Sequence, residues 1–440
     1  MTHRFPAIAS IQPMKKRTLL GLAATLPLLM AAGCGGGDSG NDAQVRLLNA
    51  STGYASVDLY VDDDLALSGT AYGTLSSFSG VPNGDVTTVL TSNGSTTELL
   101  SQSRSLSAGE NYTIIAYGWE GALKSVILQE DEAEADTGKT KVAVLNTAAD
   151  AGELDVYLTG PDELLASATP VAAGVAGSTL SSYNAITSGT FRLRVTAADD
   201  PEDVRLDVSN VVLKGKDVVT LVLTPGRSGV LVNSLMLVQG GAVTQQANTQ
   251  ARARVVAAVG SSGTVSLTAG GTALATGAKS PTIRDYVLIS AGDLAVDSTV
   301  NGTALASQTL SVAAGSDVTL LVTGSSAADA QVVLVNDDNR LPTTSTKYKL
   351  RLVHATPSLA SDNLTLTVDF SAVASDLPFA TASDFSSLTA NSSASLEVTS
   401  PSSSSALYSA SELNLAALGV YTVFLFDTTA GPNGVLRKDR

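Results

Sequence analysis

The chain has 440 residues, too many for one hydrophobic core, and at about 100–200 residues per domain its length predicts two to four domains. Its 26 Lys and Arg residues against 41 Asp and Glu residues give a net charge of −15, which opposes binding to nucleic acids and to anionic membrane surfaces. With one Cys and two His, the chain can form neither an internal disulfide nor a Cys/His zinc cluster. Hydrophobic residues make up 44% and aromatic residues only 5%, which favours an all-β fold with cores of small aliphatic side chains.

The first 33 residues have the pattern of an export signal. A basic segment, Met14–Arg17, precedes a predominantly apolar run of twelve residues that is too short to cross a bilayer as a helix. Small residues at positions 31–33 then lead to Cys34, the only cysteine. This arrangement resembles the signal peptide of bacterial lipoproteins, although Ala31 stands where Leu is commoner. Because residues 1–13 fit no part of such a signal, Met14 is an alternative start to Met1.

The lipoprotein resemblance implies a cut between Gly33 and Cys34 and a lipid on Cys34. The protein would then contact the membrane through this lipid. Gly35 follows the cysteine, where the inner-membrane retention signal of enteric bacteria has Asp. If the host is Gram-negative, the resemblance therefore implies anchoring in the outer membrane, on its periplasmic or its surface face. Residues 34–42 are mostly Gly and small polar residues, which predict a flexible tether, and no cofactor is expected.

A design of two strand-like runs around a short turn occurs four times in the rest of the chain. Its first occurrence is Gln44–Val61, where β-branched and aromatic residues with a single charge suit a half-buried strand. The later occurrences begin at Val142, Arg254 and Leu350. Each is followed by an aromatic-x-x-aliphatic-x-x-Gly pattern, except that the fourth has Asn391 in the Gly position. We interpret Asn391 as the other residue type that readily adopts a left-handed backbone.

A second marker keeps the same order and nearly the same period. A pair ending in Thr, followed by two apolar residues, recurs about every 100 residues, at Tyr112-Thr113, Val219-Thr220, Val318-Thr319 and Tyr421-Thr422. The two markers predict four tandem copies: copy 1 at residues 43–130, copy 2 at 140–240, copy 3 at 252–341 and copy 4 at 347–440. Each contains about seven strand-like segments, enough for an immunoglobulin-like or transthyretin-like β-sandwich with a core of its own.

The copies should then be held by contacts inside each sandwich. The contacts expected are Leu47 and Leu59 with Ile114 and Val126 in copy 1, and Leu352 and Leu366 with Val423 in copy 4. In addition, the spacing Leu106-x-x-Gly109-x-x-Tyr112 resembles the tyrosine corner of immunoglobulin-like sandwiches. This predicts a buried Tyr112 whose hydroxyl bonds the backbone near residues 106–109. A strand tyrosine that merely lies near a turn glycine is the alternative.

Polar segments separate the copies. The acidic run Glu130–Lys139 predicts a solvated hinge and the first site of native proteolysis. A Gln-, Thr- and Ala-rich segment, Gly240–Ala251, and a Pro- and Thr-rich segment, Leu341–Thr346, follow. Helical periodicity is scarce, and Ala410–Leu418 is the one short candidate helix.

The fourth copy opens with Leu350-Arg-Leu-Val353 and then His354-Ala-Thr-Pro357. This resembles the opening of the bacterial family known as domain of unknown function 4397, and the two markers described above resemble later segments of that family. The resemblance covers nearly all of residues 44–440 and implies exported surface lipoproteins, without implying an activity. The other three copies have Asn49, Asn146 and Ala257 where His354 stands, so we interpret the histidine as structural.

Catalytic and metal sites have weak support in the sequence. A Ser-His-Asp triad needs a base, and His354 is the only histidine after the export signal, so no catalytic residue is assigned. Asp62-Asp63-Asp64 lacks the spaced ligands of a calcium loop, and we expect a polar hairpin end, with weak calcium binding as the alternative. No metal ligand is assigned. Paired carboxylates for glycoside cleavage could come together in the fold, and the sequence leaves that alternative open.

The sequence predicts a non-enzymatic, lipid-anchored cell-envelope protein that acts as a multi-domain binding, adhesion or structural module. A polysaccharide-binding protein or a carbohydrate-active enzyme of the cell surface is the alternative. Sugar sites need exposed aromatic side chains, and Trp119 is the only tryptophan. Whether Trp119, Tyr72 and Tyr117 share one exposed face would discriminate between the two hypotheses. The protein or glycan ligand and the oligomeric state are not determined by the sequence.

Overall fold

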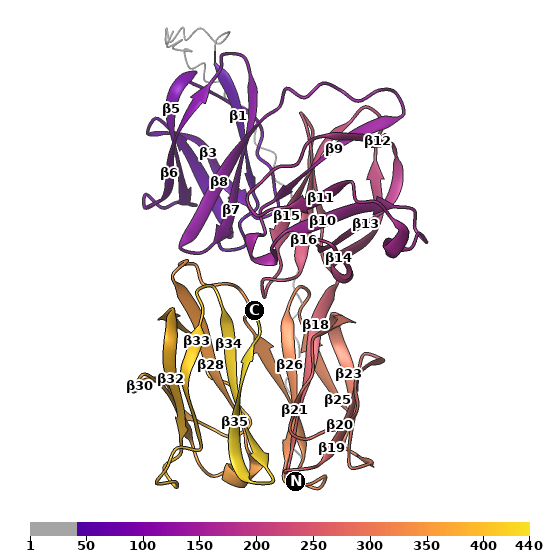
Figure 1. Cartoon of the computed structure of the whole chain (residues 1–440). Coiled ribbons are helices and arrows are strands. Elements are labelled where there is room, and N and C mark those ends of the chain that lie inside the picture. Colours follow the sequence, from indigo (N-terminus) through magenta and orange to yellow (C-terminus); the bar gives the residue numbers. More distant parts are fainter. Residues whose placement is uncertain (1–41) are drawn as a thin grey trace, which may run out of the picture. The chain divides into compact units, whose positions relative to one another are not determined.

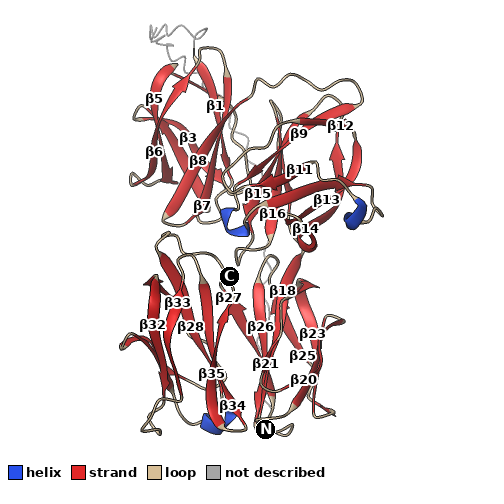
Figure 2. Ribbon diagram, in the orientation of Figure 1, coloured by secondary structure: helices blue, strands red, loops and turns tan. Residues whose placement is uncertain are grey.

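The structure, a computed structural model, describes residues 42–440. The predicted export signal, its cut site at Gly33 and Cys34, and nearly all of the tether lie outside the described residues. Within residues 42–440 the chain forms strands and three short 3-10 helices, and no α-helix (Figures 1 and 2). The predicted all-β fold is confirmed. In this part of the chain no helix is long and apolar enough to span a membrane.

The first two copies contain strands β1 to β17. In copy 1 the strands are β1 (Ala43–Asn49), β2 (Ser56–Val61), β3 (Asp64–Ala71), β4 (Ser79–Val81), β5 (Gly84–Ser92), β6 (Glu98–Leu106), β7 (Asn111–Trp119) and β8 (Ala122–Gln129). In copy 2 the elements are β9 (Lys139–Asn146), η1 (Ala149–Ala151), β10 (Leu154–Thr159), η2 (Leu165–Ser167), β11 (Ala172–Val175), β12 (Asn184–Thr187), β13 (Gly189–Ala197), β14 (Asp200–Leu213), β15 (Val218–Pro225), β16 (Val232–Val238) and β17 (Val243–Gln246).

The last two copies contain strands β18 to β35. In copy 3 the strands are β18 (Gln250–Val259), β19 (Thr264–Ala269), β20 (Thr272–Lys279), β21 (Thr282–Ile283), β22 (Val287–Ser290), β23 (Gly292–Val300), β24 (Thr303–Ala304), β25 (Gln308–Val312), β26 (Asp317–Gly324) and β27 (Gln331–Asp337). In copy 4 the elements are β28 (Lys347–Ala355), η3 (Pro357–Leu359), β29 (Leu364–Val368), β30 (Ser371–Leu377), β31 (Ser386–Thr389), β32 (Asn391–Thr399), β33 (Tyr408–Leu415), β34 (Val420–Thr428) and β35 (Gly431–Lys438).

Each copy is a sandwich of two sheets with the same topology. Copy 1 has the sheets β4-β1-β7-β8 and β3-β2-β5-β6, and copy 4 has β31-β28-β34-β35 and β30-β29-β32-β33. In every copy the opening strand pairs in parallel with the late strand that carries the Thr marker: β1 with β7, β9 with β15, β18 with β26, and β28 with β34. This shared parallel pair shows that the sequence markers describe true structural repeats.

Local turn chemistry explains where strands end. Asp62 and Asp63 have positive φ angles of 48° and 71° and form the two-residue turn between β2 and β3, so the predicted polar hairpin end is confirmed. At the marker position, Gly84 also has a positive φ, of 96°. Asn391 does not have a positive φ, so our interpretation of Asn391 as a left-handed residue is wrong. It begins strand β32 instead.

Each copy has a hydrophobic core of its own, but two further clusters join copies. Leu47, Leu59 and Ile114 lie together in the core of copy 1, as predicted. The three residues predicted for copy 4, Leu352, Leu366 and Val423, also share one core. The prediction for Val126 is wrong: Val126 packs against a separate cluster, formed by residues of copies 1 and 2, and not in the core of copy 1. A corresponding cluster joins copies 3 and 4.

The tyrosine-corner prediction is confirmed. Tyr112 is buried, and its hydroxyl accepts a hydrogen bond from the backbone N–H of Ser107 at 2.9 Å. In copy 4, Tyr421 accepts the equivalent bond from the N–H of Ala416 at 3.1 Å. Copies 2 and 3 have Val219 and Val318 in this position, so the corner is present only in the two outer copies.

The acidic run is exposed over most of its length, as expected, but Glu130 at its start is not solvated. The Glu130 side chain is 5% exposed and pairs with Arg46 at 2.7 Å, because its backbone N–H bonds Asn111 and continues the pairing of β8 with β7. The prediction of a helix is wrong. Ala410–Leu418 is not helical. Most of it lies in strand β33, which pairs with β32, because the alternating Ser, Glu and Asn residues put Leu413 and Leu415 on the core face.

Candidate binding site

His354 lies at the end of β28 and is fully buried. Its Nδ1 accepts a hydrogen bond from the Thr356 N–H at 3.4 Å, and its Nε2 lies 3.3 Å from the carbonyl oxygen of Asp362. Its ring stands edge-on to Phe379. Burial lowers the pKa of His354 below its ordinary value of 6.5, although the Asp362 carbonyl acts in the opposite direction. No carboxylate orients the ring, as a catalytic base would need.

The residues that replace His354 in two other copies make the same bonds. The side-chain oxygen of Asn49 accepts from the Ser51 N–H, and that of Asn146 accepts from the Ala148 N–H, both at 3.0 Å. Their amide groups donate to nearby backbone carbonyls. All three side chains therefore hydrogen-bond the backbone that follows the opening strand. This supports the structural interpretation of the histidine.

The metal alternatives gain no support. Asp62 accepts a hydrogen bond from the N–H of Thr87 in β5 at 2.8 Å and so ties the turn between β2 and β3 to the neighbouring strand. Within residues 42–440 no group of three or more His, Cys, Asp and Glu side chains is arranged to hold a metal ion.

A buried charge network that the sequence analysis missed lies at the joint between copies. In copy 1 the Arg46 guanidinium donates to the Thr113 hydroxyl at 2.8 Å and pairs with Glu130 at 2.7 Å. Its remaining N–H groups donate to the backbone carbonyls of Val238, the last residue of β16, and Gly241, in the turn between β16 and β17 of copy 2. Arg46 therefore joins copy 1 to copy 2 by hydrogen bonds.

Copies 3 and 4 contain this arrangement twice, and in each the arginine of one copy pairs with a carboxylate of the other. Arg254 of copy 3 donates to the Thr319 hydroxyl at 2.8 Å and pairs with Asp439 of copy 4 at 2.5 Å. Arg351 of copy 4 donates to Thr422 at 3.1 Å and pairs with Asp337 of copy 3. Both carboxylates are fully buried. Burial opposes ionisation of Asp337, but Arg351 and Arg254 together lower its pKa.

A signal for this network was present in the sequence. The Thr marker is followed, after 17 or 18 residues, by Glu130, Asp337 and Asp439. Copy 2 has Ala143 and Gln239 in the Arg and carboxylate positions and so lacks both charges. Arginine and carboxylate are therefore present together or absent together, a pattern that comparison of the four copies could have revealed.

Trp119 lies at the end of β7, where three parts of the chain meet. The Asp150 side chain in η1 of copy 2 accepts a hydrogen bond from the Trp119 indole and another from the Leu341 N–H, the latter at 2.9 Å. Burial raises the pKa of Asp150 above its ordinary value, against the effect of these bonds. The guanidinium of Arg340 lies 4.9 Å from the centre of the indole ring. Trp119 thus fixes the segment between copies 3 and 4 to copies 1 and 2.

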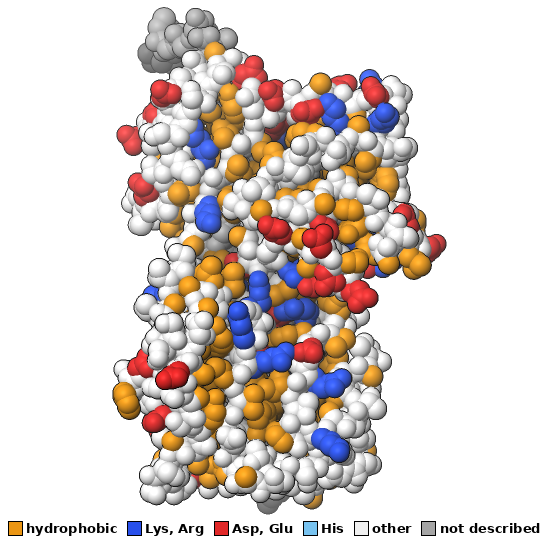
Figure 3. All heavy atoms as spheres, viewed as in Figure 1, with side chains coloured by type: hydrophobic (Ala, Val, Ile, Leu, Met, Phe, Trp, Pro, Cys, Tyr) orange, Lys and Arg blue, Asp and Glu red, His pale blue; other side chains and the backbone are white. Residues whose placement is uncertain are grey.

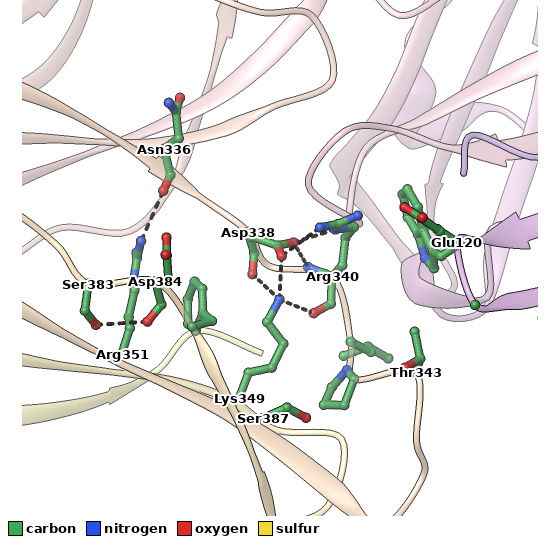
Figure 4. A pocket seen from close by; sticks show the side chains of 15 residues that line it. Glu120, Asn336, Asp338, Arg340, Thr343, Lys349, Arg351, Ser383, Asp384 and Ser387 are labelled. Atoms are coloured by element: carbon green, nitrogen blue, oxygen red, sulfur yellow. Dashed lines mark hydrogen bonds and ion pairs between the residues drawn. The ribbon is translucent and has the colours of Figure 1, made fainter. Parts of the chain in front are cut away.

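One side of Trp119 borders a cavity of about 620 Å³, which we call the paired-charge cavity (Figure 4). Figure 4 shows Lys349 and Arg340 converging on Asp338. Burial opposes ionisation of Asp338, but bonds from Arg340 and Lys349 lower its pKa to about 2. Burial lowers the pKa of Lys349, against the effect of Asp338. These three charges satisfy one another, whereas the carboxylates of Glu120 and Asp384, which also line the cavity, have no hydrogen-bond or ion-pair partner among residues 42–440.

A second cavity of about 590 Å³, which we call the aromatic cavity, has a different lining. Three of its residues are aromatic: Tyr54, Tyr72 and Trp119. Two are cationic, Arg227 and Arg340, and no Asp or Glu lines it. The remaining residues are Thr52, Ala55, Pro225, Gly226, Asn233, Ala247, Asn248 and Ala314. The lining thus comes from copies 1, 2 and 3 and from the segments between copies.

The three aromatic residues proposed as a test do not share one exposed face. Tyr72 and Trp119 are half-buried and line the aromatic cavity. Tyr117 is buried and lines, with Trp119, a smaller cavity of about 130 Å³. Tyr54, which the sequence analysis did not single out, takes the place expected for Tyr117. Two of the three expected residues therefore converge.

Figure 3 shows how charge is distributed on one face. Lys and Arg side chains gather into a group near the middle, over strands of copies 3 and 4, whereas acidic side chains are spread over the whole face.

Comparison with known families agrees with the repeat structure. The sequence profile of the domain of unknown function family DUF4397 matches residues 43–157 and 251–361, together just over half of the chain. The chain therefore belongs to this family. Each matched segment spans one copy and the opening of the next.

No curated protein sequence matches the chain. Among solved structures, it resembles the family CBM26 module CBMbc from Eubacterium rectale Amy13K, crystallised with maltoheptaose, with 12% identity and a TM-score of 0.16 over 46% of this chain and 97% of that one. It also resembles the Bacillus anthracis TIE protein, with 5% identity and a TM-score of 0.15 over 66% of this chain and 51% of that one. Neither score supports an inference about this protein.

Proposed function

We propose that the protein is a non-enzymatic, lipid-anchored cell-envelope protein whose four copies act together as a binding module. The observation that carries this proposal is the meeting of cavities at Trp119, each lined by residues of more than one copy. Such a site exists only when the copies are assembled. Buried charge pairs and shared apolar clusters hold the copies together, so the assembled chain presents a preorganised surface.

The absence of enzymatic activity is part of the proposal and rests on the state of the available groups. A glycosidase needs two carboxyl groups, one of them with a raised pKa as its acid. Asp338 in the paired-charge cavity has a pKa of about 2, and Asp150, whose pKa burial raises, is the only Asp or Glu among the described residues that line its cavity of about 130 Å³. His354 is engaged with backbone groups in all its polar positions. These assignments favour binding over catalysis.

Polysaccharide binding is the second candidate, and the aromatic cavity favours it. Tyr54, Tyr72 and Trp119 line one cavity that is within the size range of about 300–1,000 Å³ typical of small-molecule sites. Aromatic rings pack against the apolar faces of sugars, while the surrounding polar groups bind hydroxyls. The ligand of the binding module would then be a glycan of the envelope or of its surroundings.

The anchor is tested by Cys34→Ala. Acyl chains contribute about 0.8 kcal/mol per buried methylene, so a lipidated Cys34 holds the protein permanently in the membrane. We expect Cys34→Ala to leave the signal uncleaved at Gly33 and to remove the mature protein from the carbonate-washed membrane fraction. Ser39→Ala in the tether is the matched control and should remain anchored. Mature Cys34→Ala protein in the washed membrane would refute the anchor.

Binding is tested separately with the purified full chain. Envelope fragments from cells that lack the protein should bind it saturably, and Trp119→Phe should weaken this binding several-fold, because the smaller ring loses the bond to Asp150. Tyr60→Phe, at a half-buried position that lines none of the three cavities at Trp119, is the control. Binding that is non-saturable, or equal in both variants, would argue against a binding function at this site.

A further inference from the structure

We propose that the aromatic cavity binds an acidic oligosaccharide, with a sugar carboxylate on Arg227 and sugar rings against Tyr54, Tyr72 and Trp119. This inference rests on the second candidate function and names its ligand class. It starts from a contrast within one molecule. The chain carries 41 acidic residues, yet none of them lines this cavity.

Arg227 is the group that points to an anion. Its backbone N–H bonds the Gly315 carbonyl at 2.9 Å, which fixes the position of the main chain. Its guanidinium has no hydrogen-bond or ion-pair partner among residues 42–440 and lines the cavity. By contrast, Arg46, Arg254 and Arg351 are each held by a carboxylate. A free guanidinium in a cavity is suited to bind a carboxylate through two parallel hydrogen bonds.

The aromatic side chains are held in place by bonds at their polar ends. Tyr54 accepts from the Gly121 N–H at 3.0 Å, and the Tyr72 hydroxyl lies 3.2 Å from the Thr224 hydroxyl. The Trp119 indole bonds Asp150. Because the polar ends are occupied, the rings contribute apolar faces to the cavity. Three fixed rings cost little conformational entropy when a ligand packs on them.

Arg340 contributes less charge than Arg227 but helps define the wall. Two of its nitrogens pair with Asp338, at 2.7 and 2.9 Å, so its charge is largely neutralised. Its guanidinium lies over the Trp119 ring, where it also borders the paired-charge cavity. The aromatic cavity therefore has about one uncompensated positive charge, which matches one carboxylate.

The chemistry selects a sparsely charged glycan over a nucleic acid or a sulfated polymer. A net charge of −15 repels a strand with a charge on every unit, and the cavity has a single free cation among its described lining residues to offset that repulsion. A uronic acid within a short oligosaccharide supplies one carboxylate for Arg227 and pyranose faces for the rings. The ligand class is thus an oligosaccharide that contains a hexuronic acid.

The test uses the full chain in detergent and matched pairs of trisaccharides. The uronate probes are trimers of galacturonic, glucuronic and mannuronic acid, and the neutral probes are the corresponding trimers of galactose, glucose and mannose. Each pair differs only in having a carboxylate or a hydroxymethyl group at C6. Because Trp119 is the only tryptophan, its fluorescence reports on the three cavities that it borders, and calorimetry supplies an independent dissociation constant. Arg227 lines the aromatic cavity and neither of the other two, so its substitution assigns a signal to that cavity.

We expect at least one uronate trimer to bind with a change in Trp119 fluorescence and with at least about tenfold higher affinity than its neutral partner, the size expected for one charge-assisted pair. Arg227→Gln should remove most of that preference. Arg284→Gln is the matched control. Like Arg227, Arg284 is exposed and has no side-chain partner among the described residues, but it lines none of the three cavities at Trp119. It should bind like the unaltered protein.

Three results would overturn the inference. These are equal losses in Arg227→Gln and Arg284→Gln, neutral trimers that bind as tightly as uronates, and no binding of any trimer. None of them touches the anchor or the saturable binding to envelope fragments, which are measured on Cys34→Ala and Trp119→Phe. Failure of the ligand assignment is therefore distinguishable from failure of the proposed function.

Discussion

Copies 1 and 2 meet through the same face as copies 3 and 4, but the two joints differ in charge. The apolar part is equivalent: Leu48 and Ile115 in copy 1 stand at the register positions of Val353 and Phe424 in copy 4. The polar part is not. Copies 3 and 4 exchange two buried Arg–Asp pairs. Copies 1 and 2 have one buried pair, Arg46–Glu130, which lies within copy 1 and bonds only backbone groups of copy 2 across the joint.

The difference shows that apolar packing, and not the charge pairs, is common to both joints. Apolar side chains on the outer face of the parallel strand pair are present in all four copies, so they supply the common attraction. The charges are dispensable in copy 2, where Ala143 and Gln239 replace them together. This agrees with the general finding that a buried ion pair adds little net stability over apolar packing, although losing one partner alone is costly.

The largest expected effect comes from removing one partner of a reciprocal pair. Asp337→Ala leaves Arg351 with a buried, uncompensated charge and deprives the Thr319 and Tyr286 hydroxyls of their acceptor. We expect a loss of about 3–5 kcal/mol in the free energy of unfolding, measured by chemical denaturation of the full chain and followed by circular dichroism.

Gln239→Ala is the matched control, because Gln239 stands at the same position in copy 2. It makes one side-chain hydrogen bond, to the Glu132 carbonyl at 2.8 Å, and its loss should cost about 1 kcal/mol. Similar effects of the two substitutions would contradict the distinction between the joints. A smaller loss in the double variant Asp337→Ala, Arg351→Met than in Asp337→Ala would show that the stranded charge causes the damage.

A smaller effect distinguishes the outer copies from the inner ones. Tyr112→Phe and Tyr421→Phe each remove one buried hydrogen bond to backbone and should each cost about 1 kcal/mol in the same assay. Tyr60→Phe is the control, since the Tyr60 hydroxyl makes no hydrogen bond within residues 42–440. If the corner variants unfold like the control, the corner bonds do not stabilise copies 1 and 4.

The sequence predicted what is local and repeated. Alternation marked the strands, two markers revealed four copies, and the spacing around Tyr112 predicted a bond that the structure contains. Ala410–Leu418 failed because nine residues are too few to distinguish helical from strand periodicity when Ser and Ala are abundant.

The joints and cavities could not be predicted, for a physical reason. Leu48 and Ile115 have the sequence pattern of buried strand residues. Strand periodicity does not show whether such residues pack inside their own sandwich or against another copy. Glu130 looked like part of a solvated acidic run because its partner Arg46 is 84 residues away. The aromatic cavity depends on three copies and the segments between them, so its lining has no common spacing in the sequence.

The smallest effect concerns His354, and it appears as a pH dependence. An unfolded histidine binds a proton below a pH of about 6.5, whereas burial lowers the pKa of His354 in the folded copy. The stability is therefore complete above about pH 6.5 and decreases as the pH falls below it, because the unfolded chain binds the proton first. His354→Asn supplies the side chain that copies 1 and 2 use for the same bonds and removes this titration.

We expect the His354→Asn variant to lose about 1 kcal/mol or less near neutral pH, and to lose less stability than the unaltered chain between about pH 7 and pH 5.5. The measurement is the melting temperature of both chains across that range. His354 is the only histidine after the expected cut at Gly33, so the difference between the two mature chains reports on this one imidazole. A melting temperature for His354→Asn that falls as steeply as that of the unaltered chain would place the acid sensitivity elsewhere.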